Sequence, residues 1–103
     1  MNFDKVNLHD ATISEITYDW LSKEALVTGK CFNPLLNRIV NFQLKFTRVN
    51  SIEIPHSSRW GESSSIYKTF EDKQGTYCIE VQSGDILKFR CESYFLDLEK
   101  KQV

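Results

Sequence analysis

The segment from residue 40 to residue 46 constrains the fold more than any other part of the chain. Apolar and polar residues alternate along it: Val40, Phe42, Leu44 and Phe46 are apolar, and Asn41, Gln43 and Lys45 are polar. Successive side chains on a β-strand point to opposite faces, so this period of two predicts a half-buried antiparallel strand. Because no segment shows a long 3.6-residue period, we expect an all-β fold with little helix.

Shorter apolar stretches, bounded by turn residues, predict the remaining strands. They cover residues 16–20, 25–31, 49–54, 66–70, 76–82, 86–92 and 94–98. We therefore expect seven or eight antiparallel strands in a sequential meander, which can close as a barrel or fold over as a sandwich. A chain of 103 residues is long enough for one core, so we expect residues 1–103 to form a single β domain.

The loop Ser83-Gly84-Asp85 predicts the register of one hairpin. A three-residue loop there would place Ile79 opposite Phe89 on the apolar face. On the other face, Glu80 would lie opposite Lys88, which suits a solvated surface. The serine and aspartate of this loop are therefore interpreted as turn residues and not as an anion site or a catalytic pair.

Two other features mark the ends of predicted strands. The connection Asp72-Lys73-Gln74-Gly75 begins and ends with turn-forming residues and predicts a four-residue loop. That loop would set Phe70 on the same side as Tyr77. Pro55 ends the segment 49–54, and because proline cannot donate to a ladder, this segment suits an edge of a sheet.

The first predicted hairpin carries three large apolar residues at alternate positions. Ile16, Tyr18 and Trp20 would all face the interior if the turn occupies residues 21–24. The pattern falls out of phase before Ile16, which predicts a bulge near Ser14-Glu15.

Charge and hydropathy exclude several classes of protein. Lys and Arg total 13 and Asp and Glu total 14, with no long run of either sign, so we expect no nucleic-acid partner. No apolar run reaches the ~20 residues that span a bilayer, and the first residues lack the apolar region of a signal peptide. We expect a cytoplasmic protein that does not bind membranes.

The cysteines and histidines do not predict a metal site. Cys31, Cys78 and Cys91 are odd in number and far apart, which is typical of reduced thiols. With His9 and His56 they offer neither a C-x2-C nor an H-x3-H spacing. We therefore expect neither a metal nor another cofactor.

Residues 56–65 form the one long polar stretch, and Trp60 is its single large apolar residue. Loops of this kind often carry function, and tryptophan is a frequent anchor of protein interfaces. We predict a partner-binding site at Trp60, Arg59, His56 and Glu62. The competing interpretation is that the indole plugs one end of the fold.

His9-Asp10 is the most enzyme-like dipeptide, because a carboxylate can orient an imidazole for acid–base chemistry. Adjacent strand residues point to opposite faces, so the two could cooperate only on an irregular backbone. Glu15 or Glu80 could complete such an alternative polar site. The competing interpretation is a turn that leads into the first strand.

Three stretches together resemble a family of small bacterial β-rich proteins. They are residues 8–16 with Leu8-His9-Asp10-Ala11, residues 60–66 with Trp60-Gly61-Glu62, and residues 79–85 with Ser83-Gly84-Asp85. The chain is similar to predicted immunity proteins of polymorphic toxins, of the type numbered fifty. The resemblance spans residues 8 to 92 and implies a protein that binds and neutralises a toxin, without catalytic residues. The near-neutral charge departs from the acidic face with which many immunity proteins bind basic nucleases.

The leading hypothesis is a non-enzymatic cytosolic binding protein with a toxin-like protein partner, either an immunity-type inhibitor or an unassigned relative of that family. The alternative is a small enzyme or ligand-binding protein that uses His9 and Asp10. A third hypothesis is weak self-association through an unpaired strand edge.

Overall fold

The computed structural model describes residues 3, 6–56 and 64–99. In this part of the chain, eight β-strands form and no α-helix does. The strands are β1 (Thr12–Asp19), β2 (Glu24–Asn33), β3 (Arg38–Thr47), β4 (Ser51–Glu53), β5 (Ile66–Glu71), β6 (Tyr77–Val81), β7 (Ile86–Arg90) and β8 (Ser93–Leu98). Every pair of neighbouring strands is antiparallel, so the predicted all-β fold is confirmed.

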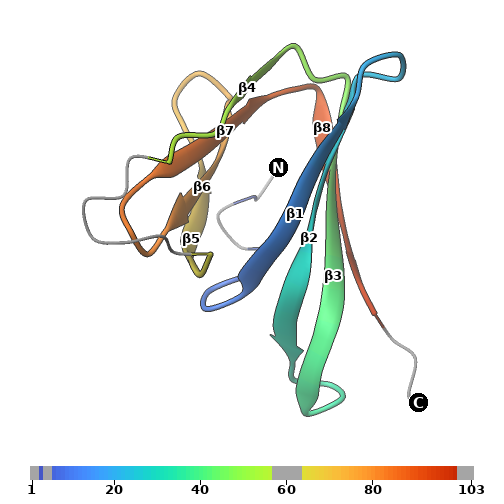
Figure 1. Ribbon diagram of the computed structural model, residues 1–103, viewed down its shortest axis with the longest axis vertical. Helices are drawn as coiled ribbons and strands as arrows, with labels where there is room; N and C mark the ends of the chain where they lie inside the picture. Colours follow the sequence, from blue (N-terminus) through green and yellow to red (C-terminus); the bar gives the residue numbers. More distant parts are fainter. Residues whose placement is uncertain (1–2, 4–5, 57–63, 100–103) are drawn as a thin grey trace.

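The strands make two four-stranded sheets, which splay apart from the corner where β7 leads into β8 (Figure 1). The first sheet has the order β1-β2-β3-β8, and the second has the order β4-β7-β6-β5. At the side away from this corner, an isolated bridge pairs Thr12 of β1 with Ser65, the residue directly before β5. The sheets do not close into a barrel, and the arrangement is an open sandwich.

The strand order departs from a sequential meander at the corner between the two sheets and again between β4 and β5. The chain leaves the first sheet between β3 and β4 and returns to it between β7 and β8, so β8 pairs with β3 and β4 pairs with β7. Glu92 N–H donates to Thr47 O and Asn50 N–H donates to Arg90 O, which carries the hydrogen bonding through the bend. β4 and β5 also follow each other in the chain without pairing, because they lie at opposite edges of the second sheet. The other consecutive strands, from β1 to β3 and from β5 to β7, are neighbours.

The core lies between the sheets and is built from the alternating residues of the central strands. Phe42, Leu44, Ile79 and Phe89 are all buried there, as the alternation predicts. The rings of Phe46 and Phe89 stack across the two sheets with centroids 4.3 Å apart. The sandwich is therefore held by β3 on one side and by β6 and β7 on the other.

The predicted register of the β6–β7 hairpin is wrong by two residues. Ile79 lies opposite Leu87 and Glu80 lies opposite Ile86, because the loop consists of residues 82–84 and not 83–85, and is closed by the Val81 N–H bond to Asp85 O. A shift of two keeps each side chain on its predicted face. It separates Glu80 from Lys88, and the carboxylate of Glu80 instead lies 4.0 Å from the ammonium of Lys68.

The predicted β5–β6 register is wrong by one residue, and the cause is a side chain. Asp72 Oδ1 accepts the backbone N–H groups of Gln74 at 2.8 Å and Thr76 at 2.9 Å. Asp72 N–H also donates to Thr76 O, so the loop shortens to residues 73–75, with Gly75 at φ 80°. Phe70 consequently lies opposite Cys78 and not beside Tyr77.

The first hairpin turns one residue earlier than predicted. Asp19 pairs with Glu24, and Lys23 N–H donates to Asp19 O, so the turn occupies residues 20–23. Trp20 therefore leaves the strand, and the prediction that it faces the interior is wrong, because its side chain is 81% exposed. The bulge predicted near Ser14-Glu15 is confirmed by the register shift between Ile13 and Glu15.

Candidate functional site

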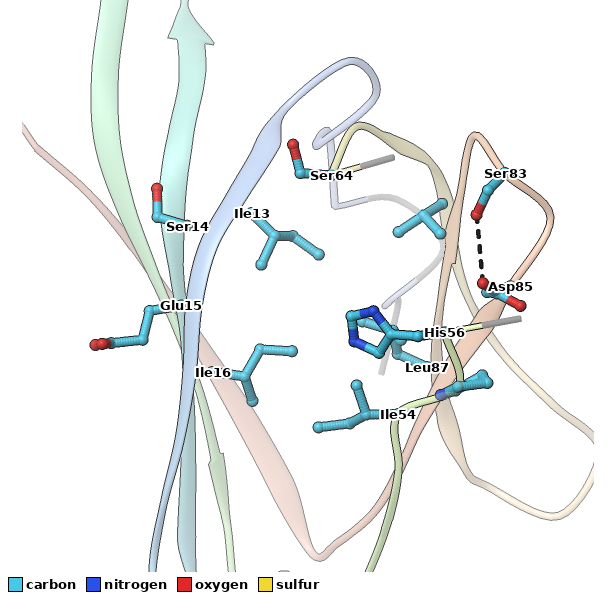
Figure 2. A pocket seen from close by; sticks show the side chains of 12 residues that line it. Ile13, Ser14, Glu15, Ile16, Ile54, His56, Ser64, Ser83, Asp85 and Leu87 are labelled. Atoms are coloured by element: carbon cyan, nitrogen blue, oxygen red, sulfur yellow. Dashed lines mark hydrogen bonds between the residues drawn. The ribbon is translucent and has the colours of Figure 1, made fainter. Parts of the chain in front are cut away.

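A cleft of about 580 Å³ opens between the two sheets, beside β1. Figure 2 shows Ile13 and Ile16 of β1 pointing toward Ile54, His56 and Leu87 on the opposite side. Branched aliphatic side chains therefore face one another across it. A cleft of this size and lining is typical of sites that bind an apolar group.

The charged groups that line the cleft are acidic among the residues that the structure describes. Asp85 lies on the loop between β6 and β7, where its Oδ2 accepts a hydrogen bond from Ser83 Oγ at 3.4 Å. Glu15 belongs to the same lining, but its side chain lies on the far side of β1 in Figure 2. No Lys or Arg lines the described part of the cleft, so the cleft favours a neutral or cationic occupant.

The predicted partner-binding residues are placed only in part. His56 is exposed and lines the cleft, directly before the segment 57–63. Arg59, Trp60 and Glu62 lie outside the described residues, so both interpretations of Trp60 stay predictions. Ser64, on the other side of that segment, also lines the cleft.

His9 and Asp10 lie together on a turn. Ala11 N–H donates to Leu8 O, and Asp10 has φ 67°, so the backbone is irregular enough to bring the two side chains together. His9 Nε2 is 3.5 Å from Asp10 Oδ2, and His9 Nδ1 is 2.6 Å from Tyr67 O. Since a carbonyl oxygen only accepts, Nδ1 carries a proton and donates it.

This pair is not joined to the other residues of the alternative polar site. Its side chains are 58% and 74% exposed, and neither lines the two clefts found among the described residues. Glu15 lies at the apolar cleft, and Glu80 faces Lys68 on the second sheet. The dipeptide thus has a carboxylate–imidazole contact but lies outside both the apolar cleft and the second cleft described below.

A second cleft, of about 490 Å³, lies beside β4 and β7 and is polar. Its charged residues balance, with Glu53 and Asp72 against Lys88 and Arg90. The guanidinium of Arg90 donates to Gln74 Oε1, which ties the cleft to the β5–β6 turn. The backbone N–H of Thr76, followed by that of Gln74, holds the pKa of Asp72 below its usual value, although burial opposes the shift.

The three cysteines are free thiols. Burial raises the pKa of Cys31 and Cys78, and it raises the pKa of Cys91 to about 11. A protonated thiol is a poor nucleophile and a poor metal ligand. Within the described ranges, no three His, Cys, Asp or Glu residues gather closely enough to hold a metal ion.

The structure also exposes apolar residues that the sequence prediction missed. The hairpin tip, which we define as Tyr18, Trp20 and Leu21, leaves Trp20 and Leu21 81% and 92% exposed. Phe32 and Ile39 form an exposed pair on the outer face of β2 and β3. Alternation from Cys31 could have placed Phe32 outside, whereas the exposure of Trp20 depended on the position of the turn.

Comparisons with known proteins add no relative. No family model, curated protein or solved structure matches the chain. No helix in the described residues is long and apolar enough to cross a membrane. Function is therefore inferred from the surfaces described above.

Proposed function

We propose that this protein is a non-enzymatic, cytoplasmic binding domain that docks a protein partner through the hairpin tip. The observation that carries the proposal is the exposure of Trp20 and Leu21 next to each other at the end of the β1–β2 hairpin. Tryptophan is among the residues that most often concentrate binding energy in an interface. Burying one such side chain against a partner contributes roughly 1.5–3 kcal/mol.

Two backbone hydrogen bonds and one ring contact order the hairpin tip in the free protein. Asp19 Oδ1 accepts the backbone N–H groups of Leu21 at 3.0 Å and Ser22 at 3.4 Å. The Tyr18 ring meets the Trp20 indole edge to face, with centroids 6.3 Å apart. A fixed tip loses less conformational entropy on binding than a mobile one, which supports its use as an anchor.

The sequence resemblance makes the proposal more specific. The resemblance implies an immunity-type inhibitor of a bacterial toxin, in which the predicted loop with Arg59, Trp60 and Glu62 would extend the interface. A stable complex buries about 1,200–2,000 Å² in total, which exceeds what the hairpin tip alone offers. His56 would then contribute from the rim of the apolar cleft.

The test is capture of a partner from the native host, followed by reconstitution with the purified partner. We expect Trp20→Ala to weaken the affinity at least about tenfold, as loss of an interface anchor does. Phe95→Ala is the matched control, because Phe95 is an exposed aromatic on the outer face of β8. Trp60→Ala tests the predicted loop in the same assay, and equal affinity of Trp20→Ala and wild type would reject the hairpin tip as the anchor.

A second candidate function rests on the 3.5 Å contact between His9 and Asp10. With Nδ1–H donated to Tyr67 O, the basic nitrogen of His9 is Nε2, which can take a proton as a general base, and the Asp10 carboxylate beside it would stabilise the resulting imidazolium. This function predicts hydrolysis of an activated ester that falls in His9→Asn and persists in His56→Asn. Equal rates in both variants and the wild type would reject this catalytic function.

A further inference from the structure

β1 is the edge strand of the first sheet, and among residues 6–56 and 64–99 most of its length has a neighbour on one side only. It pairs with β2 from Thr12 to Asp19, and on its other side it meets Ser65 through the bridge at Thr12 and Ser64 through the Ile13 N–H bond to Ser64 O. Among the described strands, none pairs with the free side from Glu15 to Asp19. An edge of this kind can accept another strand.

Hydrogen bonds at two positions show which backbone groups point outward. Asp19 O accepts from Lys23 N–H, and Glu15 O accepts from Thr28 Oγ1 of β2, so both carbonyls turn toward the hairpin. In an antiparallel pair, alternate residues bond to the neighbour and the others point away. The N–H and C=O groups of Ile16 and Tyr18 therefore face the free edge.

The free edge runs along the apolar cleft. Ile16 projects from β1 into the cleft, where Ile54 and Leu87 lie on the opposite side (Figure 2). A strand added along this edge would place every second side chain over the cleft and the others on the outer face. Apolar residues at the first set of positions would bury surface that the cleft leaves open.

The charge of β1 selects the kind of strand that can be added. The strand carries Glu15 and Asp19 and no Lys or Arg. Asp19 already accepts two backbone N–H groups, which leaves the exposed carboxylate of Glu15 to meet an added strand. A second copy of β1 would bring like charges together, whereas lysine or arginine on the added strand would be attracted.

We propose that β1 binds an extended basic segment of a protein partner as a fifth strand of the first sheet. The segment alternates apolar side chains, which enter the cleft between Ile16 and Leu87, with cationic side chains, which face Glu15. This inference rests on the proposed function, because it names the kind of partner segment that the domain takes.

The direct test is the binding of short synthetic peptides to the full chain, measured by fluorescence anisotropy and by the amide shifts of Ile16 and Tyr18. The probe alternates lysine with valine. One control replaces each lysine with glutamate, and a second carries N-methyl groups on the backbone donors of one edge. We expect binding of the lysine peptide alone, with shifts at both amides, because the other two lose charge attraction or edge hydrogen bonds.

A charge reversal sharpens the test. We expect Glu15→Lys to lower the affinity for the lysine peptide about three- to tenfold, as removal and reversal of one rim charge does. The same variant should bind the glutamate peptide. Glu71→Lys, on the exposed end of the edge strand β5, is the matched control and should bind as wild type does. Unchanged affinity in Glu15→Lys, or equal binding of the N-methylated peptide, would overturn the inference.

Failure of the added strand can be distinguished from failure of the hairpin tip as the anchor. If a captured partner depends on Trp20 but binds Glu15→Lys as tightly as wild type, the added strand is rejected and the hairpin tip stands. If the lysine peptide binds at β1 while Trp20→Ala leaves the captured partner's affinity unchanged, the reverse holds. A concentration-dependent dimer that protects the amides of Ile16 and Tyr18 would also overturn the inference, since the edge would then bind a second copy.

Discussion

Two strands of the same sheet, β3 and β1, differ sharply in how their side chains are used. Four side chains of β3 are buried in alternation, because β2 and β8 flank the strand and the second sheet covers it. β1 has no fully buried residue, since it lies at the edge, where the sheets splay apart. The difference teaches that the stability of this domain comes from its central strands, while the edge at β1 has no second strand beside it from Glu15 to Asp19 in the described part of the chain.

The largest expected effect comes from breaking the core under β3. Phe46→Ala removes a fully buried ring that stacks on Phe89 at 4.3 Å, and we expect a loss of about 3–5 kcal/mol in the free energy of unfolding. Ile16→Ala on β1 is the change for comparison and should cost roughly 1–2 kcal/mol, because its side chain is only half-buried at the edge of the core. Urea unfolding of both variants measures the difference, and equal losses would contradict the contrast between the strands.

A smaller effect is expected at Gly29, which lies on β2 between the two strands. A Cβ added there would clash with the backbone oxygen of Thr12 and would lie 2.8 Å from Phe42 Cε2. Gly29→Ala should therefore displace the start of β1 and destabilise the fold by about 1–3 kcal/mol. Amide spectra should change at residues 12 and 13, and the comparison would fail if instead the change were confined to β3.

β5 is an edge strand of the second sheet, and its position is fixed by the turn that joins it to β6. Asp72 holds that turn in its charged form, because its pKa is lowered mainly by the N–H of Thr76. A lowered pKa in the folded state adds stability above the unfolded pKa, and this stability is lost as pH falls through the folded pKa. Asp72→Ala should lower the midpoint of thermal unfolding at pH 7, and its difference from wild type should shrink in acid. A difference that does not change with pH would show that the carboxylate charge has no part.

The smallest effect on stability is expected at the hairpin tip. Trp20→Ala should change the free energy of unfolding by no more than about 0.5 kcal/mol, because the side chain is exposed. Calorimetry of the free protein measures this change beside the loss of partner affinity. A large loss of stability would mean that the indole packs against the fold and is not an anchor for a partner.

Local pattern was sufficient to predict the central strands. The alternation from Val40 to Phe46 predicted both the strand and its buried face, and the out-of-phase residues before Ile16 predicted the bulge. The β5–β6 register failed because one carboxylate, that of Asp72, shortens the loop. The β6–β7 register failed by two residues, since a slip of two leaves the apolar pattern unchanged.

The candidate surfaces depended on information that local pattern does not contain. The cleft exists because β8 returns to β3 and β4 pairs with β7, and these pairings join residues far apart in the chain. The exposure of Trp20 followed from a turn that begins one residue earlier than predicted. His9 and Asp10 were identified from the sequence as a possible pair, and it was the turn at these residues that brought them into contact.

Hydrogen exchange of individual amides in the free protein tests the openness of β1 most directly. The amides of Ile16 and Tyr18 should exchange far faster than those of Phe42 and Leu44. The amide of Thr17, whose N–H points toward β2, should be protected. The lysine–valine peptide should then slow the exchange of Ile16 and Tyr18 alone. If these two amides were already as protected in the free protein as those of β3, the edge would be covered and β1 could not be the strand that meets a partner.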